Sequence, residues 1–280
     1  MWGGRVRVAT WNVNGIRARQ GQLIEWLQRE RPDVVCLQEI KATTDQLTFD
    51  LRDLPGYWGH WHGGKGYSGV ALLVAKSLSA EPPVIVHPVF DVEQRACTTT
   101  LSTSAGDITF ASVYVPNGGK DFPAKMRFLE GIETWVATAA AGGQSLIVCG
   151  DLNVARSDMD IHPKERKPNQ VGARPDERAL FEQILSHDLV DLGRAMDPDN
   201  ENLFTWWAPW RNMRQRNIGW RIDYVLATGA VATKTRCIVV QREVGTSDHG
   251  PVIADFDIPV PPPAPVDRDL LSDAGVDPPA

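Results

Sequence analysis

Apolar runs in this chain end repeatedly in carboxylates, amides or an imidazole, groups that a buried strand does not need. SLIVCGDLNVA places Asp151 and Asn153 directly after such a run, and TSDHGPV sets Asp248 beside His249. For one such Asx residue alone, capping of a turn or helix is the better explanation. Eight such positions together favour one shared chemical site, formed by Asn12, Glu39, Tyr114, Asp151, Asn153, Asp223, Asp248 and His249.

Oxygen donors among these residues indicate a hard divalent cation. The sequence offers no cysteine or histidine cluster to supply soft ligands for zinc. The oxygens of Glu39, Asp248 and Asn12 therefore favour Mg²⁺, with Mn²⁺ as a substitute. Such an ion neutralises charge on a phosphoryl oxygen and on a departing alkoxide, which indicates hydrolysis of a phosphate ester.

The remaining groups suit the proton transfers of that hydrolysis. Asp151 with Asn153 would hold and deprotonate a water molecule. Asp223 would orient His249 through one ring nitrogen and leave the other for a phosphate oxygen. For His249 considered alone, a hydrogen bond to the backbone at a helix or strand end is the alternative.

Charge and hydropathy narrow the class of protein. The 280 residues carry a net charge of −6, which argues against a polyanionic partner. Basic residues nevertheless gather in KERK (164–167) and in WRNMRQRNIGWR (210–221), so the net charge does not exclude a phosphate-bearing ligand. No apolar stretch has the length of a membrane span, and the N-terminal residues lack the layout of a secretory signal. A cytoplasmic protein without a membrane partner is therefore expected.

Short β-branched runs alternate with helical patterns, which predicts an α/β fold. Helices are expected at 21–31, 125–141 and 176–189, the last with Asp176 as N-cap. The strands are too numerous for one crossover helix each, so antiparallel pairs and more than one sheet are expected. The predicted strands are 5–12, 33–39, 69–76, 84–90, 96–103, 107–116, 145–151, 221–228, 235–243 and 251–258.

Residues 1–258 are expected to form a single domain. The proline-rich residues 259–280 cannot build a core and are expected to be a disordered tail. The cysteines lie in strand-like text without the close spacing of a zinc site, which predicts free, mostly buried thiols at Cys36, Cys97, Cys149 and Cys237.

Seven ordered motifs resemble those of the exonuclease III family of apurinic/apyrimidinic endonucleases, within the endonuclease/exonuclease/phosphatase superfamily. GDLN and SDH mark the superfamily, and LQEIK, YVPNG and GWRIDY narrow it to the DNA-repair branch. The resemblance implies a DNase I-like, four-layer sandwich of two packed mixed β-sheets flanked by helices, with the site at one edge. The motifs are RVATWNVNGIRA, DVVCLQEIKA, GYSGVALL, SVYVPNGG, IVCGDLNVA, NIGWRIDYVLA and TSDHGPV, in order from about Arg5 to Phe256.

The resemblance also implies a role for each polar residue. Glu39 resembles the principal Mg²⁺ ligand, assisted by Asn12 and Asp248. Whether the aspartate or the histidine is the general base stays open, as does the number of metal ions. The groups that resemble the catalytic set of the family are Tyr114, Asp151, Asn153, Asp223 and His249.

The tryptophans of FTWWAPW and GWRIDY fit the same resemblance. It implies that Trp206, Trp220 and Ile222 line a pocket for a flipped, baseless sugar, whereas Trp207 is expected in the core. A missing base lowers the cost of extrusion, and a tight apolar pocket has no room for an intact nucleobase. Further DNA contacts, with solvated surface side chains as the alternative, are expected from Lys120, Arg174, Arg211 and Arg216.

The leading hypothesis is a monomeric, Mg²⁺-dependent nuclease of base excision repair. It would hydrolyse the phosphodiester 5′ to an abasic site in duplex DNA, leave a 3′-hydroxyl, and also act on blocked 3′ ends as a 3′-phosphatase or phosphodiesterase, or as a 3′-to-5′ exonuclease. One alternative is a phosphomonoesterase of the same superfamily acting on a lipid or small phosphate, against which GWRIDY argues. A second is a catalytically silent binding module, which has no need of all eight polar positions.

Overall fold

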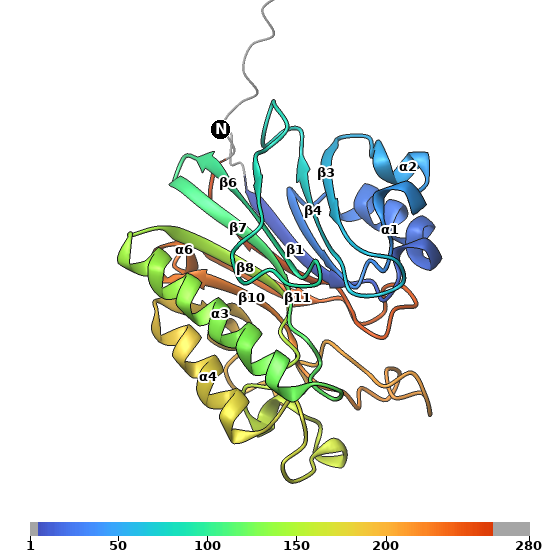
Figure 1. The fold of residues 1–280 in the computed structure, drawn as a ribbon, viewed down its shortest axis with the longest axis vertical. Coiled ribbons are helices and arrows are strands. Elements are labelled where there is room, and N and C mark those ends of the chain that lie inside the picture. The colour runs from blue at the N-terminus through green and yellow to red at the C-terminus, as the bar shows by residue number, and fades with distance from the viewer. Residues whose placement is uncertain (1–4, 260–280) are drawn as a thin grey trace, which may run out of the picture.

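The computed structural model describes residues 5–259. Two six-stranded sheets pack face to face, and helices cover both outer faces (Figure 1). The first sheet has the order β11 (Thr235–Val240), β12 (Val252–Phe256), β1 (Val6–Asn12), β2 (Val34–Gln38), β4 (Val70–Ala75) and β3 (Tyr57–His62). The second has the order β5 (Ile85–Val86), β6 (Ala96–Thr103), β7 (Gly106–Tyr114), β8 (Ser145–Asp151), β10 (Asp223–Thr228) and β9 (Leu189–Asp191).

Helices lie on opposite sides of this sandwich. α1 (Ile16–Glu30) and α2 (Phe49–Arg52) lie on the side of the first sheet, and α3 (Phe122–Ala141) and α4 (Pro175–Ser186) on the side of the second (Figure 1). The remaining helical segments are α5 (Leu192–Met196), α6 (Gly229–Ala232) and the 3₁₀ turns Thr44–Gln46, Asp158–Asp160 and Pro163–Glu165.

Central strands are buried on both faces, which explains their continuous apolar sequences. In β2, Val34 and Cys36 pack between the two sheets, while Val35 and Leu37 pack in the outer cluster with residues of α1. The second sheet packs its outer face against α3 and α4 in the same way. The expected four-layer α/β sandwich is confirmed, and so are free cysteines of which three are buried.

Two parallel pairs lie at the centres of the sheets. β1 pairs with β2, and β7 with β8, each through a crossover that contains α1 or α3. β12 and β10 run antiparallel to β1 and β8 and therefore begin where those strands end. The carboxyl ends of four strands and the loops before two others thus meet at one end of the sandwich.

Two local predictions were wrong, and some strands were missed. The run 84–90 contains only the short strand β5, because Pro88 has no N–H to extend the pairing. The aromatic strand β3 was not predicted. Arg174, not Asp176, is the N-cap of α4, and the Glu177 carboxylate accepts the Arg174 backbone N–H at 3.0 Å.

Within residues 5–259, no helix is long and apolar enough to cross a membrane. The predicted disordered tail, apart from Pro259, lies outside the described residues.

Gly150 allows β7 and β8 to approach each other just before the end of β8. A Cβ atom at this position would lie 1.8 Å from the carbonyl oxygen of Val113. We expect Gly150→Ala to lower the free energy of unfolding by at least about 1–3 kcal/mol, the usual cost of overpacking. Urea denaturation measures this loss.

Gly21→Ala is the matched control. A Cβ atom at Gly21 in α1 meets nothing within 4 Å, so this change should stabilise the protein by about 0.5–1 kcal/mol through helix propensity. Equal stability of Gly150→Ala and the parent protein would contradict the close approach of the two strands.

Candidate active site

The structure brings all eight predicted polar residues to the end of the sandwich where the strands meet. Asp151 at the end of β8 faces Tyr114 of β7 on one side and Asp223 of β10 on the other. A cleft of about 340 Å³ opens above them. Its walls are Glu39, Tyr114, Asn117, Asp151, Asn153, Val171, Gly172, Trp206, Trp220, Ile222, Asp248 and His249.

Asn12 connects the two carboxylates nearest the cleft. Its Nδ2 donates to Glu39 Oε1 and to Asp151 Oδ2, each at 2.9 Å. Lys41 Nζ lies 2.6 Å from Glu39 Oε2 and holds the other oxygen. Glu39 adopts a φ of 51°, a left-handed conformation that is uncommon for a residue with a Cβ atom.

Asp223 orients the ring of His249. Its carboxylate oxygens lie 2.9 and 3.1 Å from His249 Nδ1, and both side chains are buried. His249 Nε2, on the other side of the ring, lies 3.9 Å from Asp151 Oδ2. The imidazole is therefore held between two carboxylates and is not bonded to backbone.

Burial and charge set the protonation of this pair. Burial raises the pKa of Asp151 to about 8, with the His249 imidazolium opposing the shift and the Asp223 and Glu39 charges adding to it. Burial alone would lower the pKa of His249, but Asp223 above all, with Asp151 and Asp248, raises it to about 10. At neutral pH the imidazole is thus protonated and can donate from Nε2.

Glu39 offers an ionised oxygen for a hard cation. Burial tends to raise its pKa, but hydrogen bonds from Asn12 and Lys41 and the His249 charge outweigh burial and lower it. One ligand atom each of Glu39, Asp151 and His249 lies within 4.8 Å of the other two. Buried carboxylates gathered this closely fit a divalent cation with oxygen ligands.

Asp248 lines the cleft but makes other contacts than those expected of a metal ligand. Asn14 Nδ2 donates to its Oδ1 at 2.8 Å, and Trp206 Nε1 donates to its Oδ2 at 3.0 Å. Asn12 in turn accepts the backbone N–H of Asn14 through Oδ1 at 3.0 Å. In this arrangement Asp248 fixes the tryptophan wall and adds negative charge near His249.

The loop that carries Asn153 rests on a buried ion pair. Lys125 Nζ contacts the Glu177 carboxylate, donates to Asn153 O at 2.6 Å, and is completely buried. Asn153 Nδ2 donates to Val115 O at 2.9 Å, and its Oδ1 accepts from Asn117 Nδ2 at 3.2 Å. Both polar atoms of the Asn153 amide are therefore fixed by the segment that follows β7.

Sequence reasoning assigned no role to four residues that support the site: Lys41, Asn117, Lys125 and Glu177. Lys41 and Asn117 stand inside the motifs LQEIKA and SVYVPNGG, so the motifs were the available signal. Nothing in the local sequence distinguishes Lys125 and Glu177 from solvated helix residues.

The tryptophans form one wall of the cleft. Trp206 and Trp220 meet edge to face with ring centroids 6.3 Å apart, and the buried Ile222 lies beside them. In the described part of the chain, the buried Nε1 of Trp220 has no hydrogen-bond partner. Trp207 is 1% exposed and packs in the core, as predicted.

The four basic residues expected at DNA lie outside this cleft. Lys120 lines a larger neighbouring cleft of about 1190 Å³, together with Asn117. The guanidinium of Arg174 bonds to Asp176 and stacks on the ring of Phe122 at 4.0 Å. Two exposed side chains lie on the loop between β9 and β10: Arg211 and Arg216.

Other basic residues of the same segment hold the structure. Arg214 donates to backbone carbonyls of the loop that leads into the SDH motif and to the carbonyl of the serine in that motif. Arg221 is 2% exposed and donates to Asp160 at 2.7 Å and to both oxygens of Asp191 at 2.8 Å. Its neighbours in sequence are the cleft residues Trp220 and Ile222, so this buried network anchors the tryptophan wall.

Known proteins match the chain over nearly all of the described fold. A model of the Endonuclease/Exonuclease/phosphatase family matches residues 9–249. The chain is 30% identical to "DNA repair nuclease APEX1" of Danio rerio, over 88% of this chain and 81% of that protein. It is 30% identical to an "Exodeoxyribonuclease" of Bacillus subtilis, over 88% of this chain and 98% of that protein. A solved AP endonuclease from Archaeoglobus fulgidus is 28% identical with a TM-score of 0.79, over 90% of this chain and 99% of that one.

The Asp223 carboxylate should control the charge of His249. We expect Asp223→Asn to lower the pKa of His249 from about 10 toward or below its ordinary value, about 6.5, because burial is then less opposed. Folding raises the pKa of His249 to about 10. The His249–Asp223 pair therefore stabilises the folded protein fully below about pH 6.5, and this stabilisation is lost as pH rises through 10.

Imidazole NMR titration of the metal-free protein and urea denaturation at several pH values measure both effects. The charge-matched control is Asp53→Asn, at an exposed position. An unchanged His249 titration in Asp223→Asn would show that the pair does not set the charge.

Proposed function

The chain belongs to the endonuclease/exonuclease/phosphatase family, and from that premise we propose that it is a DNA-repair nuclease that hydrolyses the phosphodiester 5′ to an abasic site in duplex DNA. The product would carry a 3′-hydroxyl. The observation that carries the proposal is a buried aspartate and a buried histidine side by side, Asp151 and His249, facing a cleft walled by tryptophans. The names of the two relatives and of the solved neighbour support nuclease action on DNA.

Mg²⁺, with Mn²⁺ as a substitute, is the proposed cofactor. Glu39 would be its principal ligand, with Asn12 and Asp248 beside it. The ion supplies neutralisation of charge on a phosphoryl oxygen and on the leaving alkoxide. The close approach of the Glu39 and Asp151 carboxylates, whose ligand atoms lie within 4.8 Å of each other, supports a cation at this position.

Two side chains of the protein, Asp151 and His249, would carry out the proton transfers. Asp151, fixed by the Asn12 amide and by the Asn153 backbone N–H at 2.9 Å, would accept the proton of the attacking water, with Asn153 helping to position that water. A cation held by Glu39 would lower the pKa of Asp151 from about 8 and so favour its ionised form at neutral pH. His249, protonated and oriented by Asp223, would donate to the scissile phosphate, and Tyr114 would contact it from the end of β7. These charges favour Asp151 as the base.

The pocket of Trp206, Trp220 and Ile222 would select the baseless sugar. Extrusion costs least where a base is missing, and these three side chains line a cleft that would receive the extruded sugar. The same site would trim blocked 3′ ends or remove 3′ nucleotides, and the name "Exodeoxyribonuclease" of the Bacillus subtilis relative supports removal of nucleotides from DNA. We propose that residues 1–258 act as one monomeric catalytic domain, with Lys120, Arg174, Arg211 and Arg216 near the DNA backbone.

Incision of a duplex that carries one abasic analogue tests the activity. Cleavage is expected with Mg²⁺ and none with EDTA. Glu39→Ala and Asp151→Asn should each lower the rate at least about a hundredfold, the scale of losing a metal-positioning or proton-transfer group. The exposed Glu25→Ala and Asp53→Asn are matched controls. No incision by the parent protein with Mg²⁺ would reject the function, and near-parent rates of both site variants would reject the assignment.

The tryptophan wall can be tested separately. Trp220→Ala should lower abasic-site incision by about 5–150-fold, the range for one lost aromatic contact with a nucleotide, and lower removal of 3′ nucleotides less. Trp210→Ala, at a tryptophan that is 58% exposed and outside the cleft, is the control. Equal losses of both activities in Trp220→Ala would indicate a general structural effect instead of selection of the baseless sugar.

A further inference from the structure

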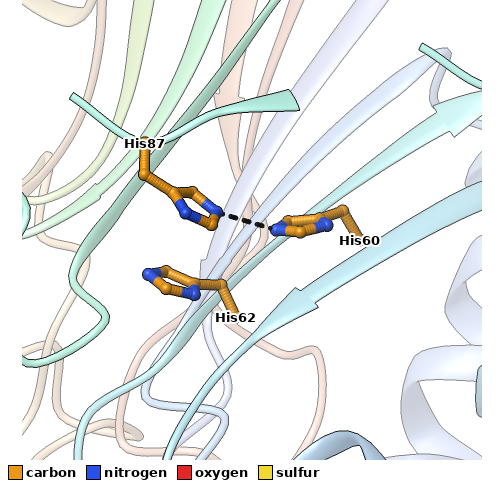
Figure 2. Close-up of side chains that lie close together, drawn as sticks. All are labelled: His60, His62 and His87. Carbon is orange, nitrogen blue, oxygen red and sulfur yellow. Dashed lines mark hydrogen bonds between the residues drawn. The ribbon is translucent and has the colours of Figure 1, made fainter. Parts of the chain in front are cut away.

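Three imidazoles converge at an edge of the sandwich away from the catalytic cleft (Figure 2). His60 and His62 lie on β3, the outermost strand of the first sheet, and His87 directly follows β5, the outermost strand of the second. One ring nitrogen of each lies within 4.8 Å of the other two. The sequence-based conclusion that no histidine cluster exists was wrong, because the third ring comes from another sheet.

Two of the rings are already spaced like metal ligands. His60 Nε2 and His87 Nε2 lie 3.0 Å apart and face each other (Figure 2). In a tetrahedral zinc site with Zn–N distances of about 2.0–2.1 Å, two ligand nitrogens are about 3.3 Å apart. His62 stacks on His87 with ring centroids 3.9 Å apart and 15° between the planes, so its ring must tilt to reach the same ion.

Asp91 is placed to orient His62. Its Oδ2 lies 2.6 Å from His62 Nε2, and its Oδ1 accepts the backbone N–H groups of Arg95 and Ala96 at 2.7 and 2.9 Å. A carboxylate on one histidine nitrogen, itself fixed by other hydrogen bonds, is the usual outer-shell partner of a metal-binding histidine. It leaves His62 Nδ1 as the nitrogen available to a cation.

The three side chains of the cluster offer only nitrogen ligand atoms. Neutral imidazole nitrogens favour zinc and its neighbours in the first transition series over Mg²⁺, which prefers oxygen. The cluster therefore differs in chemistry from the site at Glu39.

We propose that His60, His62 and His87 bind a zinc-class transition-metal ion, with Asp91 orienting His62 from outside the coordination sphere. The ion joins β3 to the end of β5 and so cross-links the exposed edges of the two sheets. Water completes its coordination, because the cluster is only partly buried and His87 is exposed. An ion that binds the folded chain alone stabilises it by mass action.

Calorimetric titration of the full, chelator-treated protein with ZnCl₂ tests the site. It is done in the Glu39→Gln background as well, so that binding at the catalytic carboxylates is separated. We expect one equivalent of zinc in both proteins, with a Kd in the micromolar range or below. His60→Asn and His87→Asn should weaken binding at least about a hundredfold, and Asp91→Asn, which keeps all three rings, about 10–100-fold.

His187→Asn is the matched control, because His187 pairs with Glu133 outside the cluster. Zinc should raise the melting temperature of the parent and of this control, but not that of His60→Asn or His87→Asn, whose folding is checked by circular dichroism without metal. Absence of zinc binding by the parent, or equal binding by parent and the His60→Asn/His87→Asn double variant, overturns the proposal. In that case the hydrogen bond and the ring stacking alone hold the rings together.

Discussion

Asp151 is 1% exposed and lies among Glu39 and Asp223, so its carboxylate is buried next to two others. Burial of a charge is costly unless it is paired and hydrogen-bonded. Here two groups compensate the buried charge: the Asn12 amide, at the end of β1 in the opposite sheet, and the His249 ring, in the loop before β12. The site therefore exists only when both sheets are assembled. Asp151, which the proposed chemistry requires, also holds the end of β8 to the end of β1 through the Asn12 amide.

The topology of the sheets explains why residues far apart in the sequence meet at one site. Because β1 and β2 are parallel, and β7 and β8 likewise, their ends supply Asn12, Glu39, Tyr114 and Asp151 to one place without long loops. The antiparallel β10 begins opposite Asp151 and adds Asp223 in register. Hydrolytic chemistry is thus carried by strand ends, whose positions are fixed by backbone pairing, and less by mobile connections.

The sequence predicted those features that a local run of residues indicates, and it did not predict contacts between residues far apart in the chain. The apolar runs and motifs were enough for the two-sheet α/β class and for the eight residues at the cleft, since each stands at a strand end or in a motif next to a strand. Partners were not predictable: Asp248 bonds to Trp206 and Asn14, and Lys125 reaches Asn153 through space. β3 was missed because its alternating aromatic and histidine residues do not form an apolar run, and the histidine cluster was missed because it spans two sheets.

The buried clamp of Arg221 on Asp160 and Asp191 has a consequence for recognition. Its two sequence neighbours, Trp220 and Ile222, are held in place before any ligand arrives. A wall that is already rigid loses little conformational entropy on contact, so more of the contact energy remains for affinity. The same rigidity means that an oversized guest is rejected by steric exclusion and cannot be accommodated by adjustment of the wall.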